Sequence, residues 1–208
     1  EISNLCEKTG VNVEDVSIGI GLDKRIGSRF LRAGPAYGGS CFPKDTRALT
    51  VTADKFNTDL SIIKSVIKSN TRRKKLLIER VKKILLNRIK NKKITFLGVT
   101  FKPNTDDMRE SSTLLMIPFL INKGAKISYY DPTGKKDQFS KLKNVTCFNE
   151  ISSACKKADL IIIHTEWEEF KALDFKKLSK NNKFKIYDLR NLYSVRQMKK
   201  EGFSYYSI

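Results

Sequence analysis

The residues best suited to chemistry lie in one stretch, GPAYGGSCFPKD at 34–45, where three glycines stand close to a single cysteine. Gly38 and Gly39 permit backbone conformations that are closed to other residues, and they let a ligand approach the main chain. The cysteine that follows them is Cys41. This stretch is therefore the first candidate for a catalytic or binding site.

Cys41 has the neighbours that a reactive thiol needs. Pro43 is expected to begin a helix, which places Cys41 beside the positive end of a helix dipole, and Lys44 adds a second positive charge. Both favour the thiolate, the form that attacks carbonyl carbon. Asp45 is placed to orient water or to accept a proton. The alternative for a lone cysteine is a small buried apolar residue. It suits the cysteines that lack such neighbours, which are Cys6, Cys147 and Cys155.

The first half of the chain, residues 1–88, reads as one helical segment that carries the cysteine loop. Helices are expected at 11–21 and 43–56, and apolar residues keep a helical period from 59 to 87. The last of these helices would be about 40 Å long at about 1.5 Å per residue. We expect a helix of this length to connect two domains.

The second half, residues 89–208, alternates strands with helices, which predicts right-handed crossovers and a parallel sheet. The expected strands are 92–99, 125–131, 158–165 and 183–189. The expected helices are 111–124, which contains Pro118, 149–158 and 174–181. The predicted fold class is α/β: a helical segment with a long connecting helix, then a doubly wound, Rossmann-like domain with a parallel sheet.

Polar side chains follow these strands at their carboxyl ends, where parallel sheets bind ligands. Cations beside an aromatic residue suit a phosphate-bearing ligand with a flat base, and ordinary loop polarity is the alternative. The side chains expected at this edge are Lys102, Arg109, Trp167 and Arg190. The glycine fingerprint GxGxxG of a nicotinamide-binding domain does not occur in the sequence.

The formal net charge of +19 would suit nucleic acid, an anionic membrane surface or small anions as partners. Two basic runs, RRKK at 72–75 and KNKK at 90–93, are interpreted as solvated surface. Aromatic residues that would stack bases are missing around both runs. The longest apolar run, 114–121, is far shorter than the roughly 20 residues of a spanning helix. We therefore expect neither nucleic acid nor a membrane as a partner.

The cysteines and the first residues indicate the cellular setting. The four cysteines are widely spaced, and the chain has one histidine, so neither a metal site nor a disulfide framework is expected. A reduced, cytoplasmic location fits best. The opening residues EISNLCEK lack the features of a signal peptide, and they read like a helix entered part-way. We interpret the chain as a fragment of a longer one.

In order along the chain, the motifs resemble those of the UDP-glucose 6-dehydrogenase family, within the wider nucleotide-sugar dehydrogenases. GPAYGGSCFPKDTRAL is similar to the active-site signature of that family. The other stretches that resemble it are GLDKRIGSRFL at 21–31, FLGVTFKPNTDDMRES at 96–111, YYDP at 129–132, TEWEEF at 165–170 and DLRNLY at 188–193.

The resemblance implies an oxidation of UDP-glucose to UDP-glucuronate in two hydride transfers, with NAD as the cofactor. The cysteine would capture the intermediate aldehyde as a thiohemiacetal, and water would hydrolyse the resulting thioester. On this basis Cys41 is the nucleophile, and Asp45 assists the hydrolysis. Lys44 and the Cys41 loop would border the nicotinamide, and Arg109 would reach NAD.

The resemblance also implies where the UDP-sugar binds. Its implied contacts are Arg32, Ala33, Gly34, Pro35, Ala36, Tyr37 and Gly38 in the loop, and Phe101, Lys102 and Arg190 in the second domain. Arg25 is expected to enter the site of a neighbouring subunit, in a homodimer formed through the helical domain. The N-terminal NAD-binding domain of the family is absent from these 208 residues, so the chain alone is expected to be inactive.

Other functions stay open at this stage. Within the same group, a dehydrogenase acting on GDP-mannose or UDP-N-acetylmannosamine is the alternative, although TEWEEF and DLRNLY look more like the UDP-glucose branch. From other classes, the alternatives are a basic module that binds nucleic acid or anionic surfaces, and a regulatory or assembly module whose chemistry is vestigial.

Overall fold

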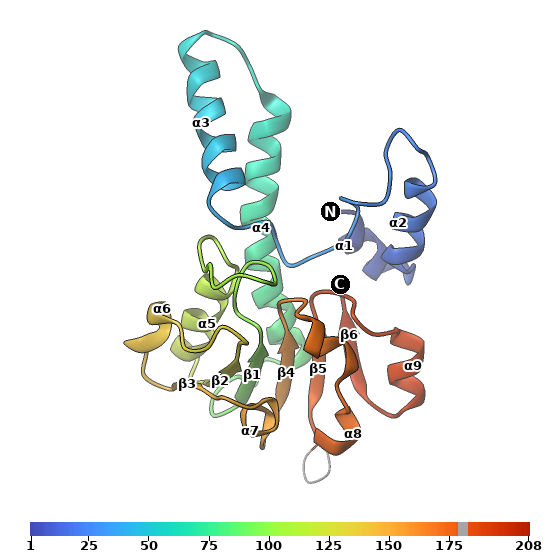
Figure 1. Cartoon of the computed structure of the whole chain (residues 1–208), viewed down its shortest axis with the longest axis vertical. Helices are drawn as coiled ribbons and strands as arrows, with labels where there is room; N and C mark the ends of the chain where they lie inside the picture. Colours follow the sequence, from blue (N-terminus) through green and yellow to red (C-terminus); the bar gives the residue numbers. More distant parts are fainter. Residues whose placement is uncertain (179–182) are drawn as a thin grey trace.

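The computed structural model describes residues 1–178 and 183–208. Six parallel strands form one sheet in the order β3-β2-β1-β4-β5-β6, with helices on both faces and a helical hairpin above it (Figure 1). The strands are β1 (Lys93–Leu97), β2 (Lys126–Tyr130), β3 (Val145–Cys147), β4 (Leu160–Ile163), β5 (Lys185–Asp188) and β6 (Ser204–Ser207). The predicted α/β fold with a parallel sheet is confirmed.

The outermost strands, β3 and β6, are the two that the sequence did not predict. The central strand β4 is a continuous run of buried aliphatic residues, which is the pattern of a parallel strand covered on both faces. The strand β3 has only three residues, none of them buried, and β6 reads SYYS with one buried residue. Edge strands are covered less completely, so their residues carry a weaker apolar signal.

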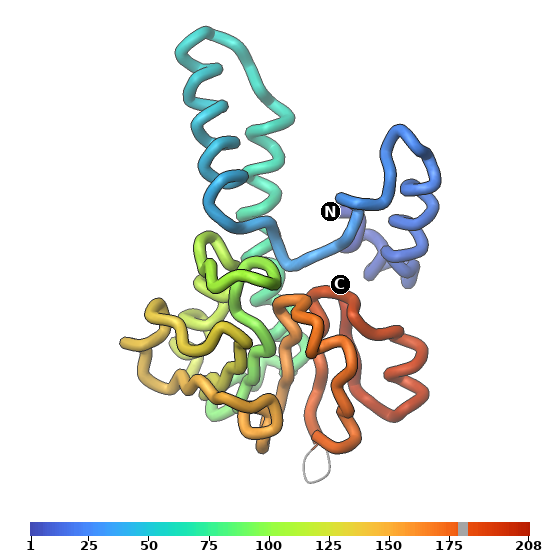
Figure 2. The backbone as a smooth tube through the Cα atoms, in the orientation of Figure 1, coloured from blue at the N-terminus to red at the C-terminus, as the bar shows by residue number. Residues whose placement is uncertain are grey.

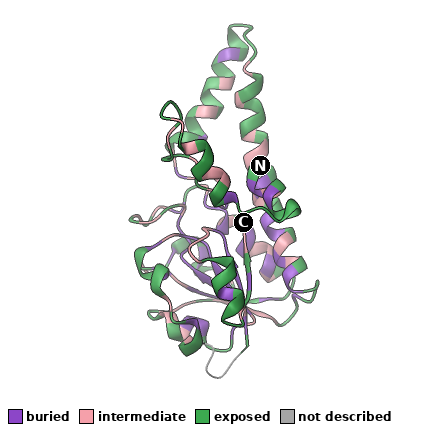
Figure 3. Cartoon of the chain, turned by 90° about the vertical axis from the view of Figure 1, so that its right-hand side faces the viewer, coloured by how far each residue is buried: buried purple, intermediate pink, exposed green. Residues whose placement is uncertain are grey.

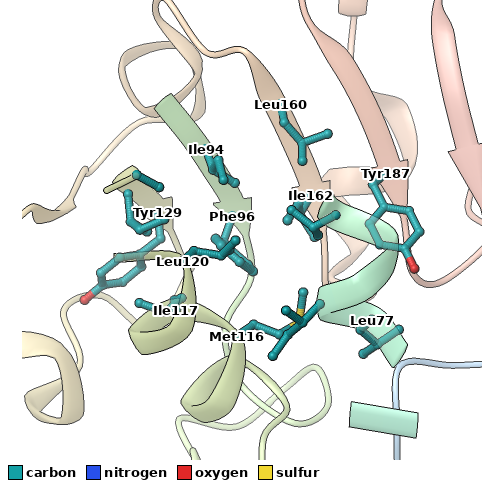
Figure 4. Close-up of a cluster of buried hydrophobic side chains, with 14 of the residues drawn as sticks. Leu77, Ile94, Phe96, Met116, Ile117, Leu120, Tyr129, Leu160, Ile162 and Tyr187 are labelled. Atoms are coloured by element: carbon teal, nitrogen blue, oxygen red, sulfur yellow. The ribbon is translucent and has the colours of Figure 1, made fainter. Parts of the chain in front are cut away.

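Alternate residues of the strands point to opposite faces of the sheet and form two cores. On one face, Ile94 and Phe96 of β1 pack with helices α4 (Ser61–Ile84) and α5 (Thr113–Asn122), as Figure 4 shows. On the other face, Ile161 and Ile163 of β4 pack with α7 (Ile151–Cys155), α8 (Phe175–Leu178) and α9 (Val195–Lys200). The short α6 (Asp137–Ser140) and the 3₁₀ helix η1 (Glu168–Ala172) are the remaining helices described in the second half of the chain. The expected helix 174–181 is found as α8, and its last three residues lie outside the described part.

The helix α4 is the long helix that the sequence predicts, and it belongs to both halves of the molecule. Its 24 residues extend about 36 Å at about 1.5 Å per residue. The first half packs beside α3 (Cys41–Lys55) in the hairpin, and its surface is largely exposed (Figure 3). The second half buries Leu77, Val81 and Ile84 in the core of the sheet. The domain boundary expected after residue 88 stays a prediction, because these side chains reach across it.

Two short helices, α1 (Ile2–Thr9) and α2 (Val13–Gly21), begin the chain beside the hairpin. Asn12 caps α2 by accepting a hydrogen bond from the backbone N–H of Glu14. Arg73 of α4 donates to the side chain of Asn4, which ties α1 to α4. No helix in the described residues is both long and apolar enough to cross a bilayer.

His164, directly after β4, lies fully inside the protein. Its Nε2 is 2.7 Å from Ser112 Oγ, and its Nδ1 is 3.1 Å from Thr165 Oγ1. Burial disfavours the charged imidazolium, and the positive charge of Arg190 acts in the same direction. Together they hold the pKa of His164 well below 6.5.

We expect this histidine to make folding stability fall as the pH decreases from about 6.5. The unfolded chain takes up a proton on His164 in that range, and the folded chain does not. The free energy of unfolding should therefore decrease by up to about 1.4 kcal/mol per pH unit until the folded pKa is reached. Urea unfolding of the parent and of His164→Gln between about pH 7 and 5 measures this. Equal pH slopes for the two proteins would contradict the prediction.

Candidate functional site

The helix α3 begins at Cys41 itself, with Ser40 as the N-cap residue. The expectation that Pro43 begins the helix is wrong: Pro43 is the third helical residue, and it is buried. Proline fits there because the first backbone N–H groups of a helix have no intrahelical acceptor. The Cys41 thiol is exposed and lies 3.7 Å from Ser40 Oγ. The helix therefore places this thiol at its positive end, as the sequence predicts.

The other three cysteines differ from Cys41 in exposure. Cys6 and Cys155 are buried, and burial raises the pKa of the Cys155 thiol to about 12. Cys147 is partly buried, with its Sγ 3.8 Å from the carbonyl oxygen of Phe148. Cys41 is thus the cysteine that solvent and a ligand reach most easily.

The two glycines before Cys41 lie against Phe101, which follows β1. Gly39 has a φ of +83°, and a Cβ placed on it would lie 2.8 Å from Phe101 Cζ. A Cβ on Gly38 would lie 2.8 Å from Phe101 Cβ and 2.9 Å from the carbonyl oxygen of Glu110. The backbone N–H of Gly39 also donates to the backbone carbonyl oxygen of Arg109 at 2.8 Å. The structure thus shows that the glycines make room for the segment after β1.

Glu110 holds that segment against the helical hairpin. Its carboxylate pairs with Lys74 of α4 at 2.7 Å and with Arg47 of α3 at 2.9 Å. Lys74 and then Arg47 lower the pKa of Glu110, which is therefore ionised at neutral pH. The residue has a φ of +57°, in the left-handed region that non-glycine residues rarely adopt. Figure 2 shows the loop after β1 directly below the hairpin.

Arg109 presents an exposed guanidinium beside the cysteine loop. Asp107 accepts hydrogen bonds from its Nε and Nη2 and is the main cause of the raised pKa of Arg109. The backbone carbonyl oxygen of Arg109 accepts from the N–H of Gly39, two residues before Cys41. Lys102 is also exposed, with its Nζ 5.4 Å from the centre of the Phe101 ring.

Arg190 connects the sheet to the loop that precedes Cys41, and most of its hydrogen-bonding groups are used in contacts within the protein. Its Nε donates to the carbonyl oxygen of His164 at 2.8 Å, and its Nη2 donates to that of Phe101 at 3.0 Å. Its Nη1 points at Gly34, 3.3 Å from where a Cβ would lie. The expectation that Trp167 joins these cations is wrong. That indole is buried in the second core, because the chain turns back over the sheet face after β4.

Two polar residues of α4 hold the loop that precedes Cys41, and a third, Lys74, holds Glu110. Asn70 accepts a hydrogen bond from the backbone N–H of Tyr37 at 3.0 Å and donates one to its carbonyl oxygen at 3.1 Å. Arg73 is buried and donates to the carbonyl oxygen of Gly34 at 3.1 Å. With Lys74, these residues have the spacing i, i+3, i+4 of one helix face. That spacing is the signal which could have found them. The run RRKK is therefore only partly solvated surface.

We expect Asn70→Asp to loosen this loop. An aspartate still accepts from the N–H of Tyr37, but it loses the donor and sets a carboxylate against the carbonyl oxygen. The free energy of unfolding should decrease by about 1–3 kcal/mol. Chemical denaturation measures this, with Asn122→Asp on an exposed helix end as the matched control. Equal stability of the two variants would contradict a clamping role for Asn70.

A cavity of ≈ 950 Å³ lies between the loop, α1 and the first half of α4. Four residues of the predicted sugar-binding set line it: Arg32, Ala33, Gly34 and Tyr37. Pro35 is buried in the loop, and Ala36 is partly buried. The residues around Cys41 are not among those that line this cavity. The predicted residues thus form two groups, which Arg190 and the loop backbone connect.

Three further predicted residues lie at the surface. Lys44 and Asp45 are exposed, with Nζ and Oδ1 3.5 Å apart. Arg25 follows α2 and forms a 2.6 Å ion pair with Asp23. The structure does not bring Arg25 to Cys41 within this chain. In the described residues, no cluster of three or more His, Cys, Asp or Glu side chains is arranged to hold a metal ion.

The sheet has the strand order of a dinucleotide-binding domain, but its residues do not fit a dinucleotide. In such domains an acidic residue near the end of the second strand binds the ribose. Here Asp131 is buried, accepts a hydrogen bond from the N–H of Val99 at 2.8 Å, and lies 3.6 Å from the Lys136 ammonium. Its carboxylate is used inside the protein, and the glycine fingerprint is missing.

Comparisons with known proteins find one family along most of the chain. Residues 1–72 match the model of the "UDP-glucose/GDP-mannose dehydrogenase family, central domain", and residues 95–195 match that of the "UDP binding domain" of the same family. A UDP-glucose 6-dehydrogenase of Rhizobium meliloti is 45% identical over 209 residues, which are 100% of this chain and 48% of that protein. The chain spans about half the length of the curated relatives it matches.

Solved structures show the same arrangement. A UDP-glucose dehydrogenase from Pyrobaculum islandicum superposes with a TM-score of 0.81 at 28% identity, covering 96% of this chain and 44% of that chain. An NDP-N-acetyl-D-galactosaminuronic acid dehydrogenase from Methanosarcina mazei gives 0.85 at 23% identity, covering 100% and 46%. The second likeness concerns the fold alone.

Proposed function

Because the chain belongs to the UDP-glucose/GDP-mannose dehydrogenase family, we propose that it forms the central and UDP-sugar-binding parts of an NAD-dependent UDP-glucose 6-dehydrogenase. The observation that carries the proposal is the exposed Cys41 thiol at the first position of α3, below which Phe101 and Arg109 gather. A thiol at a helix N-terminus suits addition to a carbonyl carbon.

In this function Cys41 adds to the aldehyde at C6 of the sugar, and the thioester formed by the second oxidation is hydrolysed by water. Asp45 is one helical turn after Cys41 and exposed, which suits a group that orients the water. The nicotinamide cofactor supplies the oxidation. Since this sheet does not fit a dinucleotide, we place its binding on a further domain of a longer polypeptide.

The UDP-sugar lies along the loop 32–38 in this proposal, with Phe101, Lys102 and Arg190 on the side of the sheet. Lys102 is exposed and forms no salt bridge in the described residues, so its ammonium is available to a diphosphate. The Nη1 of Arg190 faces the loop at Gly34. Support for the choice of UDP-glucose comes from the relatives at 40–45% identity that are named UDP-glucose 6-dehydrogenase.

A homodimer through the helical half is part of the proposal. Large apolar side chains stay exposed along α2, α3 and α4 in this chain, such as Leu22 at 79%, Phe56 at 76% and Ile62 at 76%. Exposed apolar side chains of this size on the helical half are available for another protein surface to cover. Arg25 is 89% exposed in its side chain, so a neighbouring subunit could contact it in place of its ion pair with Asp23.

The test uses both the 208-residue chain and a longer polypeptide that adds the dinucleotide-binding domain. We expect the longer protein to produce UDP-glucuronate and two NADH per UDP-glucose, and the chain alone to produce none. Titration calorimetry with UDP-glucose, GDP-mannose and UDP-N-acetylmannosamine ranks the substrates. Turnover by the chain alone would refute the proposal that the cofactor binds on a further domain. A preference for either other sugar would refute the choice of UDP-glucose.

A further inference from the structure

The fold gathers positive charge at one edge of the sheet. The loops that lead into β1 to β5, with the first residues of those strands, lie at the amino-terminal edge, on the lower side of the sheet in Figure 1. We call the Lys and Arg residues described there the basic edge. They are Arg88, Lys90, Lys92, Lys93, Lys123, Lys126, Lys141, Lys143, Lys156, Lys157, Lys183 and Lys185.

The opposite, carboxyl edge has no such excess. The loops after β1 to β5 contain five cations, Lys102, Arg109, Lys135, Lys136 and Arg190. The same loops contain six carboxylates, Asp106, Asp107, Glu110, Asp131, Glu150 and Glu166. Basic residues that are scattered along the sequence are therefore separated in space. The surplus positive charge of the sheet lies on the edge away from Cys41.

Little of the basic edge is neutralised within the protein. Asp159 is the acidic residue described there, and it accepts from Lys92 Nζ at 2.6 Å and from the backbone N–H of Lys93. The other cations of the edge form no salt bridge with an acidic residue in the described part of the chain. Burial is the main cause of the lowered pKa of Lys93, and neighbouring Lys156 lowers it further. Such crowding of like charges favours an anionic partner.

The shape and the apolar content of the edge select among anionic partners. The cations come from five separate loops, so they spread over a broad face. Leu86, in the loop between α4 and β1, is 70% exposed and has a φ of +52°. The same loop contacts the next one, because the N–H of Asn91 donates to Gly124 at 2.8 Å. An exposed leucine among lysines suits an interface of acidic headgroups and acyl chains better than a nucleic acid duplex, whose phosphates attract cations but leave no apolar layer for the leucine to enter.

We propose that the basic edge docks this protein on an anionic lipid bilayer, with Leu86 entering the headgroup region. Several lysines near a surface of acidic lipids add their attractions, and the sum binds a protein reversibly without a spanning segment. The sequence led us to expect no membrane partner because its longest apolar run is too short to span a bilayer and its basic runs were interpreted as solvated surface. Docking by this edge leaves the carboxyl edge and Cys41 turned away from the lipid, open to a diffusing nucleotide sugar.

The experiment is co-sedimentation of the 208-residue chain with vesicles of phosphatidylcholine containing about 30% phosphatidylglycerol, compared with pure phosphatidylcholine. Binding is expected only to the acidic vesicles, and it should weaken strongly between about 0.1 M and 0.5 M salt. The variant Lys90→Glu/Lys123→Glu/Lys126→Glu/Lys157→Glu should bind at least about tenfold more weakly. All four side chains are exposed.

A matched control changes the same net charge elsewhere, at the exposed residues Lys24, Lys55, Lys68 and Lys75. Each is replaced by glutamate, and this control should keep vesicle binding within about twofold of the parent. Leu86→Ser should weaken vesicle binding and leave retention on heparin unchanged. Circular dichroism confirms that each variant is folded.

Three outcomes would overturn the proposal. The first is the absence of binding to acidic vesicles. The second is an equal loss of vesicle binding in the edge variant and in the control, which would mean that binding depends on net charge and not on the basic edge. The third is tighter binding of duplex DNA than of vesicles at the same salt, with no effect of Leu86→Ser on either.

Discussion

Replacing Cys41 with serine is expected to reduce UDP-glucuronate production by at least about 1000-fold in the longer protein that carries the dinucleotide-binding domain. A serine hydroxyl is a far weaker nucleophile than a cysteine sulfur, so it cannot replace Cys41 in forming the covalent intermediate. The measurement is the steady-state rate with UDP-glucose and NAD⁺, together with chromatographic detection of the uronate. Cys147→Ser is the matched control, because that thiol is partly buried and away from the loop.

Alkylation of the 208-residue chain tests the accessibility of the Cys41 thiol without the longer protein. Iodoacetamide should label Cys41 first, since Cys6 and Cys155 are buried. Mass spectrometry of the digested chain identifies the labelled site. Unchanged uronate production by Cys41→Ser, with Cys41 labelled as expected, would mean that the thiol is accessible and not catalytic.

Gly39→Ala is expected to destabilise the protein more than a single added methyl group on a solvent-exposed glycine does. The added Cβ would lie 2.8 Å from the Phe101 ring and would also strain a residue whose φ is +83°. The conformational strain amounts to about 1 kcal/mol, and the contact adds about 1–3 kcal/mol. Gly134→Ala is the matched control: its φ is +77°, and nothing lies within 4 Å of the added Cβ.

A double-mutant cycle isolates the contact. In Gly39→Ala/Phe101→Ala the ring is gone, so the double variant should lose less stability than the sum of the two single changes. Urea denaturation gives the four free energies of unfolding. If Gly39→Ala costs no more than Gly134→Ala, Phe101 is not what requires a glycine at this position.

The part of the site that the sequence predicts best is local in the chain. The position of Cys41 at the start of a helix follows from its neighbours, since glycines end the preceding loop and proline tolerates the first helical turn. Only the exact start differs, by two residues. The alternation of strands and helices likewise predicts the sheet, because each strand is an apolar run of its own.

The spacing along α4 marks the residues that hold the site, but their partners could not be predicted, because each contact joins residues far apart in the chain. Asn70 meets Tyr37 across 33 positions, and Glu110 meets Arg47 across 63. A polar residue on a helix looks solvated until its partner is known. Trp167 was misplaced for a similar reason: its position after a strand suggested the ligand edge, but the second core has room for its ring.

The shared helix α4 has a consequence for modularity. Its second half contributes Leu77, Ile78, Val81 and Ile84 to the core of the sheet, while Asn70 and Arg73, one to two turns earlier, hold the loop before Cys41. Recombination between relatives at residue 88 would therefore pair a sheet with a foreign core helix. A chimera of two relatives that preserves both halves must join them within α4, before Leu77. The two parts of α4 must then continue as one helix in the same register. This constraint applies equally to natural recombination and to engineered chimeras.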